Sequence, residues 1–173
     1  MNPRLPPHFQ LIHNTEAMKD DPGEESIIQA LTGGLEWPRF VLEGPGDDAA
    51  LLQDGQVLTT DLMVEEVHFD HKVSPEDLAW KLLAINASDV AACGATPTWA
   101  LLSLALPQPL DGQWSERFAL AFRESAKSLG VALIGGDTTR SPGPKILNLA
   151  MAGKCDGNPL LRSGASPQEH VGC

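Results

Sequence analysis

The sequence has few positively charged residues. It contains 12 lysines and arginines against 23 aspartates and glutamates, which gives a formal net charge of −11. Nucleic-acid-binding proteins usually carry a basic face, so this imbalance argues against such a partner. The acidic excess fits either a solvated surface or a group of carboxylates that converge and need a cation. Only the positions of the acidic residues can separate these two explanations.

Long apolar runs and a disulfide pattern are missing as well. Pro, Gly or Asp interrupts each apolar stretch before the roughly 20 residues that a membrane-spanning helix needs, so we expect no membrane partner. Residues 1–10 contain one arginine, three prolines and no apolar segment typical of a secretory signal, and we therefore expect a cytoplasmic protein. Cys93, Cys155 and Cys173 form no CxxC pair and have no histidine at ligand spacing, which argues against disulfides and a zinc site.

The familiar phosphate-binding and hydrolytic motifs are also absent. The chain has no GxxxxGK[ST] segment, which excludes a P-loop, and no GxGxxG segment that opens a helix after a strand. It has no GxSxG or HExxH segment either. A nucleotide or metal site in this protein therefore has to be built from other residues.

The chain does have the material for a folded domain. Apolar residues make up 42% of its 173 residues, enough for the core of one domain or of part of a larger protein. A helix is predicted over residues 75–93 with Ser74 as its N-cap, and a second over residues 112–129 with Asp111 as its N-cap. A short helix is predicted over residues 24–31. Apolar runs predict strands over residues 40–42, 49–52, 56–60, 98–106, 131–134 and 145–152.

This order of strands and helices predicts an α/β sandwich, that is, a sheet covered by helices. Three aspartates follow predicted strands or lie in glycine-rich turns: Asp48, Asp61 and Asp137. Each such segment alone is usually just a turn. Their joint occurrence at strand ends favours a Mg²⁺ site, because hard cations take oxygen ligands and glycine-rich turns leave backbone N–H groups open to a phosphate.

A polar pair interrupts the otherwise apolar helix predicted over residues 75–93. Asn86 and Asp89 are three residues apart, so they share a face of this helix. A buried carboxylate without a partner costs several kcal/mol or becomes neutral. A capping or interhelical hydrogen bond is one explanation, and coordination of a metal ion is the more economical one.

The loop after Asp61 contains Glu65, Glu66 and His68. Adjacent acids in a loop usually form a solvated face, although a catalytic pair is possible in principle. A single histidine in a polar loop is more often incidental than functional. The residues themselves therefore leave the role of this loop open.

Five segments together resemble the thiamine-monophosphate kinase family. They are residues 44–52, 59–69, 83–97, 133–140 and 161–165. The wider superfamily, which includes aminoimidazole ribonucleotide synthetase and selenide water dikinase, shares an Asp-rich ATP site but not this whole set. The resemblance implies the amino-terminal domain of the aminoimidazole ribonucleotide synthetase-like fold, an α+β sandwich with a mixed or antiparallel sheet covered by helices.

The resemblance also implies an activity, the transfer of the γ-phosphoryl group of ATP to thiamine monophosphate to give thiamine diphosphate. It implies no enzyme nucleophile, ATP contacts at Gly136, Asp137 and Arg162, and a substrate contact at His68. Positions that match magnesium ligands of the family are Asp48, Thr59, Thr60, Asp61, Asp89 and Asp137.

Members of this family form homodimers whose amino-terminal sheets pair, and they are roughly twice as long as this chain. The resemblance therefore implies a homodimer and three regions. These are a loose lead-in with a short helix over residues 1–35, an ATP- and Mg²⁺-binding domain over 36–155, and the start of a truncated second domain over 156–173. Two alternatives stay open: a non-catalytic nucleotide-binding or dimerisation module, and another ATP-using member of the superfamily.

Overall fold

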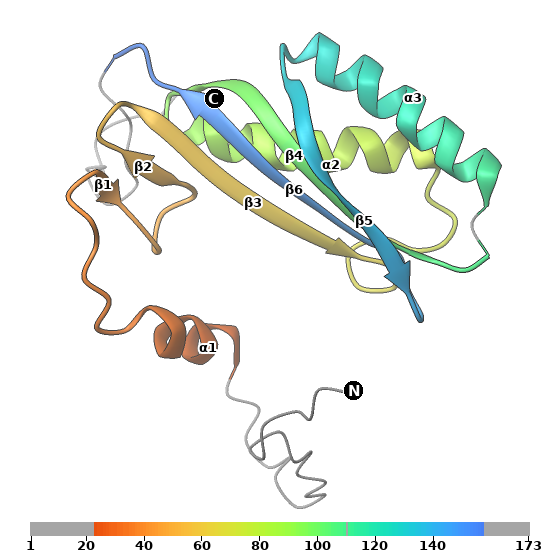
Figure 1. Cartoon of the computed structure of the whole chain (residues 1–173), viewed down its shortest axis with the longest axis horizontal. Coiled ribbons are helices and arrows are strands. Elements are labelled where there is room, and N and C mark those ends of the chain that lie inside the picture. Colours follow the sequence, from red (N-terminus) through yellow and green to blue (C-terminus); the bar gives the residue numbers. More distant parts are fainter. Residues whose placement is uncertain (1–22, 110, 158–173) are drawn as a thin grey trace, which may run out of the picture. The chain divides into compact units, whose positions relative to one another are not determined.

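The computed structural model describes residues 23–109 and 111–157, and the chain divides into two compact units, residues 1–36 and 37–173. The described residues form three helices and a six-stranded sheet (Figure 1). In chain order these elements are α1 (Gly23–Thr32), β1 (Val41–Glu43), β2 (Ala50–Leu52), β3 (Gln56–Val64), α2 (Pro75–Ala92), β4 (Thr96–Pro107), α3 (Gly112–Ser128), β5 (Ala132–Ser141) and β6 (Ile146–Lys154).

Helix α1 belongs to the first unit and confirms the short helix predicted there. Glu24 and Glu25 lie in its first turn, where negative charge stabilises the helix dipole. The Thr32 hydroxyl donates to the carbonyl oxygen of Ile28 at 2.8 Å in the last turn. The side chain of Leu31 is 71% exposed, and none of the residues of this helix is buried.

The six strands of the second unit follow the order β1-β2-β3-β6-β4-β5. All neighbouring pairs are antiparallel except β4 and β5, which are parallel and connected through α3. Strand β6 is the last in sequence but lies between β3 and β4 (Figure 1). This mixed sheet confirms the predicted α+β fold class.

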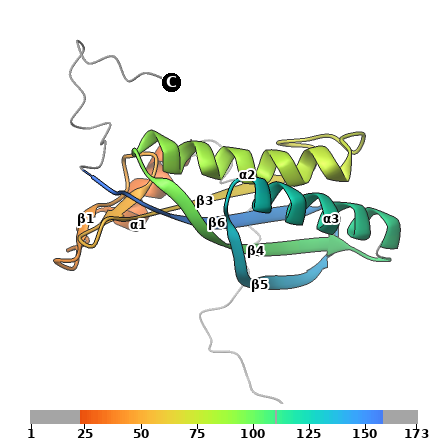
Figure 2. The same ribbon diagram turned by 90° about the horizontal axis from the view of Figure 1, so that it is seen from above.

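Helices α2 and α3 lie side by side on one face of the sheet (Figure 2). We call this the helix face, and the opposite one the open face. Leu82 and Leu83 of α2 and Leu147 and Leu149 of β6 are fully buried between the two layers. Arg117 of α3 binds Glu76 of α2 through two hydrogen bonds of 2.7 Å. No helix in the described part of the chain is long and apolar enough to cross a lipid bilayer.

Local signals set the starts of α2 and α3 as expected. The Ser74 hydroxyl accepts from the amide of Asp77 at 3.0 Å, and the Asp111 carboxylate accepts from the amides of Gln113 and Trp114 at 3.0 and 3.2 Å. Each cap satisfies donors that have no partner within the helix. The predicted N-caps of both helices are therefore confirmed.

The predicted ends of two strands are wrong. Strand β3 continues to Val64, so Asp61 lies inside the strand and does not follow it. Strand β5 runs from Ala132 to Ser141, so Gly136 and Asp137 lie within a strand instead of a turn. Pairing with β6 and with β4, respectively, supplies hydrogen bonds along these segments, and this tertiary pairing overrides the local preference of Gly and Asp for turns.

Candidate functional site

Four of the predicted metal ligands gather on the helix face. Val57 and Met63 of β3 are buried there, and the two-residue period of a strand places Thr59 and Asp61 on the same side. The Thr59 hydroxyl lies 2.9 Å from Oδ2 of Asp89 on α2 and 3.4 Å from the carbonyl oxygen of Asp48. Strand β3, helix α2 and the turn before β2 therefore contribute to one oxygen-rich group.

The carboxylates of this group destabilise one another. Burial raises the pKa of Asp89, the hydrogen bond from Thr59 opposes this effect, and the negative charges of Asp61 and Asp48 raise the pKa further. Burial also raises the pKa of Asp61, and the nearby His68 ring partly lowers it. Ionised carboxylates in this arrangement gain from a cation, since a positive charge removes both the repulsion and the desolvation cost.

The donor atoms of the group fit magnesium. They are carboxylate, hydroxyl and carbonyl oxygens, the ligands that hard cations prefer. Within residues 23–109 and 111–157 no three acidic, histidine or cysteine side chains are close enough to hold a metal ion by themselves. Mg²⁺ is usually bound by one or two carboxylates and completes its shell with water and substrate phosphates.

Asn86 provides a further observation in favour of a cation. It is fully buried on α2, one turn before Asp89, and its Nδ2 donates to the carbonyl oxygen of Leu82 at 2.9 Å. Its Oδ1 has no hydrogen-bond partner among the described residues. An unpaired buried oxygen is costly, so a cation or its bound water beside Asp89 would stabilise this side chain.

Thr60 and Asp137 lie on the open face instead. Thr60 alternates with Thr59 along β3 and is exposed. Asp137 of β5 pairs with Ser103 of β4, which in turn pairs with Asn148 of β6. Paired residues of neighbouring strands share a face. The structure thus divides the six predicted metal ligands between the two faces of the sheet, a division that the sequence did not predict.

Asn148 links β6 to β3 beside two of the predicted ligands and was missed in the sequence. Its Nδ2 donates to the Thr60 hydroxyl at 2.9 Å and to the carbonyl oxygen of Asp61 at 3.0 Å. It therefore holds the side chain of Thr60 and the backbone of Asp61. The one signal in the sequence is that a polar residue interrupts the apolar run over residues 145–152.

The remaining predicted site residues are distributed as follows. His68 lies in the loop after β3, close enough to Asp61 to influence its pKa. Gly136 lies in β5, next to Asp137. Arg162 lies outside the described residues, as do the lead-in before residue 23 and the end of the chain after residue 157.

Glu65 is not part of a solvated face, contrary to the usual behaviour of adjacent acids in a loop. Its side chain is 12% exposed and accepts from Nζ of Lys145 at 2.6 Å. Burial raises the pKa of this carboxyl, and the hydrogen bonds and charge of Lys145 lower it more, so that its pKa lies below the usual range. The same ammonium group lies 5.7 Å from the centroid of the Trp114 ring. Glu65 therefore has a structural role in joining this loop to the start of β6.

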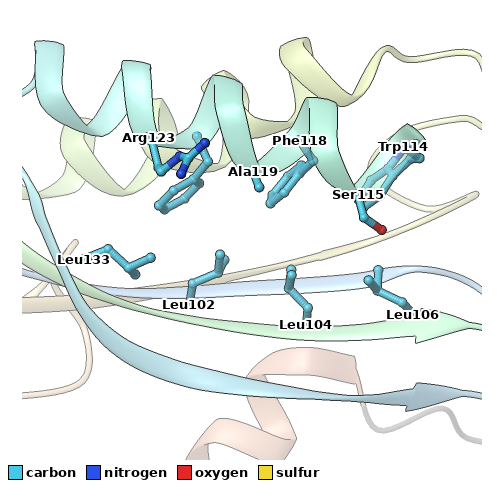
Figure 3. A pocket seen from close by; sticks show the side chains of 10 residues that line it. Leu102, Leu104, Leu106, Trp114, Ser115, Phe118, Ala119, Arg123 and Leu133 are labelled. Carbon is cyan, nitrogen blue, oxygen red and sulfur yellow. The ribbon is translucent and has the colours of Figure 1, made fainter. Parts of the chain in front are cut away.

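A separate cavity of about 220 Å³ lies between α3 and the strands β4 and β5 (Figure 3). Leucines of β4 face the aromatic rings of α3 across it, and Leu133 of β5 and Arg123 of α3 lie at one end (Figure 3). None of the predicted site residues lines it. Its apolar walls do not suit a magnesium ion.

Comparison with known proteins gives a consistent result. Residues 46–155 match the family model of the AIR synthase related protein, N-terminal domain. The thiamine-monophosphate kinase of Escherichia coli K12 is 39% identical over 155 residues, and that of Bacillus subtilis is 40% identical over 158 residues. Each alignment covers 86% of this chain and 47% of the relative, so the chain spans about half the length of these proteins.

Solved structures agree with this comparison. A structure described as AaThiL complexed with AMPPCP and TMP has a TM-score of 0.74 and 31% identity, and the match covers 84% of this chain and 46% of that one. The thiamine monophosphate kinase of Aquifex aeolicus has a TM-score of 0.69 and 29% identity, over 80% of this chain and 44% of that one. The chain therefore belongs to the family of AIR synthase related proteins and carries the N-terminal domain of that family.

Proposed function

We propose that this chain forms the magnesium- and nucleotide-binding half of a thiamine-monophosphate kinase. The complete reaction transfers the γ-phosphoryl group of ATP to thiamine monophosphate and gives thiamine diphosphate and ADP. The observation that carries the proposal is the convergence of Asp48, Thr59, Asp61 and Asp89, with raised pKa values for the partly buried carboxyls of Asp61 and Asp89. Its relatives named as this kinase, and a similar structure described with AMPPCP and TMP, support the choice of reaction.

Different residues have different roles in the proposed reaction. Bound Mg²⁺ supplies positive charge to neutralise the phosphate oxygens. Gly136, Asp137 and Arg162 contact ATP, and His68 contacts thiamine monophosphate. No enzyme nucleophile is needed, because a phosphate oxygen of the acceptor attacks directly and the protein contributes position and charge. The ligands proposed for magnesium are Asp48, Thr59, Asp61 and Asp89 on the helix face and, for a separate ion, Thr60 and Asp137 on the open face.

A second candidate function is a non-catalytic nucleotide-binding or dimerisation module. Such a module binds MgATP on the same oxygen-rich group and dimerises through its sheet, but it does not transfer the phosphoryl group. We propose that residues 156–173 begin a second domain that holds the remaining ligands in longer members, and that the protein works in the cytoplasm. A third candidate, another ATP-using member of the superfamily, differs only in its acceptor.

Two measurements on the 173-residue chain separate these candidates. Calorimetry with ATP and Mg²⁺ is expected to give heat of binding, and omission of Mg²⁺ is expected to remove it. Chromatography of a reaction with thiamine monophosphate tests for thiamine diphosphate, whose formation would exclude the non-catalytic module. Absence of both heat and product, with no second domain encoded downstream, would refute the kinase proposal. The third candidate would be favoured if a substrate panel showed that another acceptor is phosphorylated and if His68→Ala left the use of thiamine monophosphate unchanged.

The open face supports the proposed homodimer. Leu62 of β3 and Leu101 of β4 are 52% and 38% exposed there. A hollow on this face is lined in part by Leu58, Thr60 and Trp99. In the described part of residues 37–157, the helices α2 and α3 both lie on the helix face and leave the open face uncovered. Exposed apolar area of this kind marks a surface for association, and pairing two such sheets would bury it in both copies.

Leu62→Glu is expected to convert the dimer to a monomer, because it places a charge in the middle of the buried surface. Sedimentation equilibrium measures the molecular mass. We expect twice the mass of the chain for the parent and the mass of a single chain for Leu62→Glu. Leu120→Glu on α3 is the matched control, since Leu120 is 51% exposed and lies outside the open face. A monomeric parent, or equal masses for all three proteins, would contradict the dimer.

A further inference from the structure

The loop that carries His68 is closed by its own hydrogen bonds. The amide of His68 donates to the carbonyl oxygen of Val64 at 2.8 Å, and the amide of Glu66 donates to the carbonyl oxygen of Phe69 at 2.7 Å. The Phe69 side chain is only 8% exposed and joins the core. Glu66 adopts a φ of +65°, an uncommon conformation for a residue other than glycine. The loop therefore has a defined shape with its histidine on the outside.

One nitrogen of the His68 ring has a fixed role. The amide of Val64 donates to Nδ1 of His68 at 3.0 Å. A backbone amide only donates, so Nδ1 must carry a lone pair and the proton of the neutral ring must lie on Nε2. The exposed edge of the ring therefore presents an N–H group, which suits an anionic oxygen.

Two lysines anchor this loop to other elements. Lys81 of α2 donates from Nζ to the carbonyl oxygen of His68 at 2.8 Å. On the other side, the amide of Glu65 donates to the carbonyl oxygen of Lys145 at 2.9 Å, and the amide of Lys145 donates to Oε2 of Glu65 at 3.0 Å. Of the two lysines, Lys81 alone bonds to His68 itself, so it has the more direct effect on where the ring lies.

We propose that Lys81 is a positioning residue that holds the backbone of His68. With the backbone held, Nδ1 of the ring stays bonded to the Val64 amide, and Nε2–H points outward as a donor beside Asp61. The identity of the acceptor rests on the proposed function, in which it is a phosphate oxygen of thiamine monophosphate. A ring free to turn or to exchange its proton would present a lone pair to that oxygen in part of the molecules and repel it. Fixing the ring before binding avoids this cost.

The positioning role can be tested without any ligand. Scalar coupling across the hydrogen bond between the Val64 amide nitrogen and His68 Nδ1 is measured by NMR above neutral pH, with His68→Gln to assign the ring. The coupling is expected in the parent and in Lys81→Arg, which keeps a donor, and is expected to disappear in Lys81→Met. Lys127→Met on α3 is the control for loss of an exposed lysine and should keep it. Coupling of equal size in Lys81→Met, or none in the parent, overturns the proposal.

A second measurement addresses the acceptor. Titration of thiamine monophosphate into the parent is expected to shift the His68 Nε2 resonance, and Lys81→Met should lower the affinity by roughly 10-fold to 100-fold, while Lys81→Arg restores it. Equal affinity in the parent and Lys81→Met, with the ring shift present, overturns the positioning role. If the parent shows the coupling but does not respond to thiamine monophosphate, the result supports the positioning role and counts against the proposed function. The positioning role and the proposed function can therefore fail separately.

Discussion

Asp89→Asn is expected to remove most of the Mg²⁺-dependent ATP binding and to leave the fold intact. Asp89 accepts a hydrogen bond from Thr59 and repels Asp61 and Asp48, so it is the carboxylate common to the whole group on the helix face. Loss of groups that merely orient a metal ligand costs 10-fold to 100-fold in affinity, so loss of a ligand should cost roughly 100-fold or more. Calorimetry with ATP in the presence and absence of Mg²⁺ measures this loss.

The same substitution is expected to stabilise the metal-free chain slightly. Because the folded state raises the pKa of Asp89 and Asp61, each carboxyl contributes stability below the ordinary aspartate value of 3.8. That contribution is lost as the pH rises through the raised pKa, and at neutral pH the ionised pair opposes folding. Asparagine in place of Asp89 should reduce this pH dependence, as measured by thermal unfolding between acid and neutral pH without metal.

Asp156→Asn is the control for the loss of one negative charge, because Asp156 is exposed and follows the last strand. It should change neither ATP binding nor the dependence of stability on pH. Equal ATP affinity in Asp89→Asn and the parent would contradict the metal role of Asp89. A large loss of thermal stability in Asp89→Asn without metal would show instead that this side chain serves the fold.

Gly136→Ala is expected to detach β5 from β4. Gly136 has a φ of +152°, and a Cβ atom at this position would lie 1.8 Å from the carbonyl oxygen of Leu102 and 2.7 Å from its carbonyl carbon. Both are backbone atoms of the neighbouring strand, so no side chain can move aside. Combining a strained backbone with overpacking, each of which costs 1–3 kcal/mol, gives an expected loss of roughly 3 kcal/mol or more.

This loss should be concentrated in β5, because the strand lies at the edge of the sheet and is exposed over nearly its whole length. Hydrogen exchange should show faster exchange for the amides of β5 than for those of β6. Gly143→Ala is the matched control, since a Cβ atom there meets nothing within 4 Å. Equal protection of β5 in both variants would mean that the strand can shift to make room for a methyl group.

Local signals made part of this structure predictable. Ser74 and Asp111 satisfy backbone amides within their own first turns, so the sequence was enough to locate both helix starts. Asp54-Gly55 is a dipeptide typical of tight hairpin turns, and Gly55 has a φ of +81° between β2 and β3. These features depend on residues a few positions apart in the chain.

The sequence suggests candidate residues for the site but not their arrangement. Asp61 and Asp137 were expected together at strand ends, whereas they lie inside strands and on opposite faces of the sheet. The face of a strand residue depends on register, which is set by partners far away in the sequence, such as β6 for β3. The sequence does not predict the role of His68 either, because the Lys81 side chain that bonds to its carbonyl oxygen is 13 residues away on α2.

The sequence by itself determined the family resemblance, the candidate ligands, the helix caps and the presence of an α+β fold, because each depends on residue type or on short spacing. Tertiary structure alone decided that β6 lies between β3 and β4, that the acidic residues divide between two faces, and that Glu65 pairs with Lys145. The physical reason is that sheet pairing and burial act between residues distant in the chain. They decide which aspartates lie close enough to repel one another and to gain from a magnesium ion.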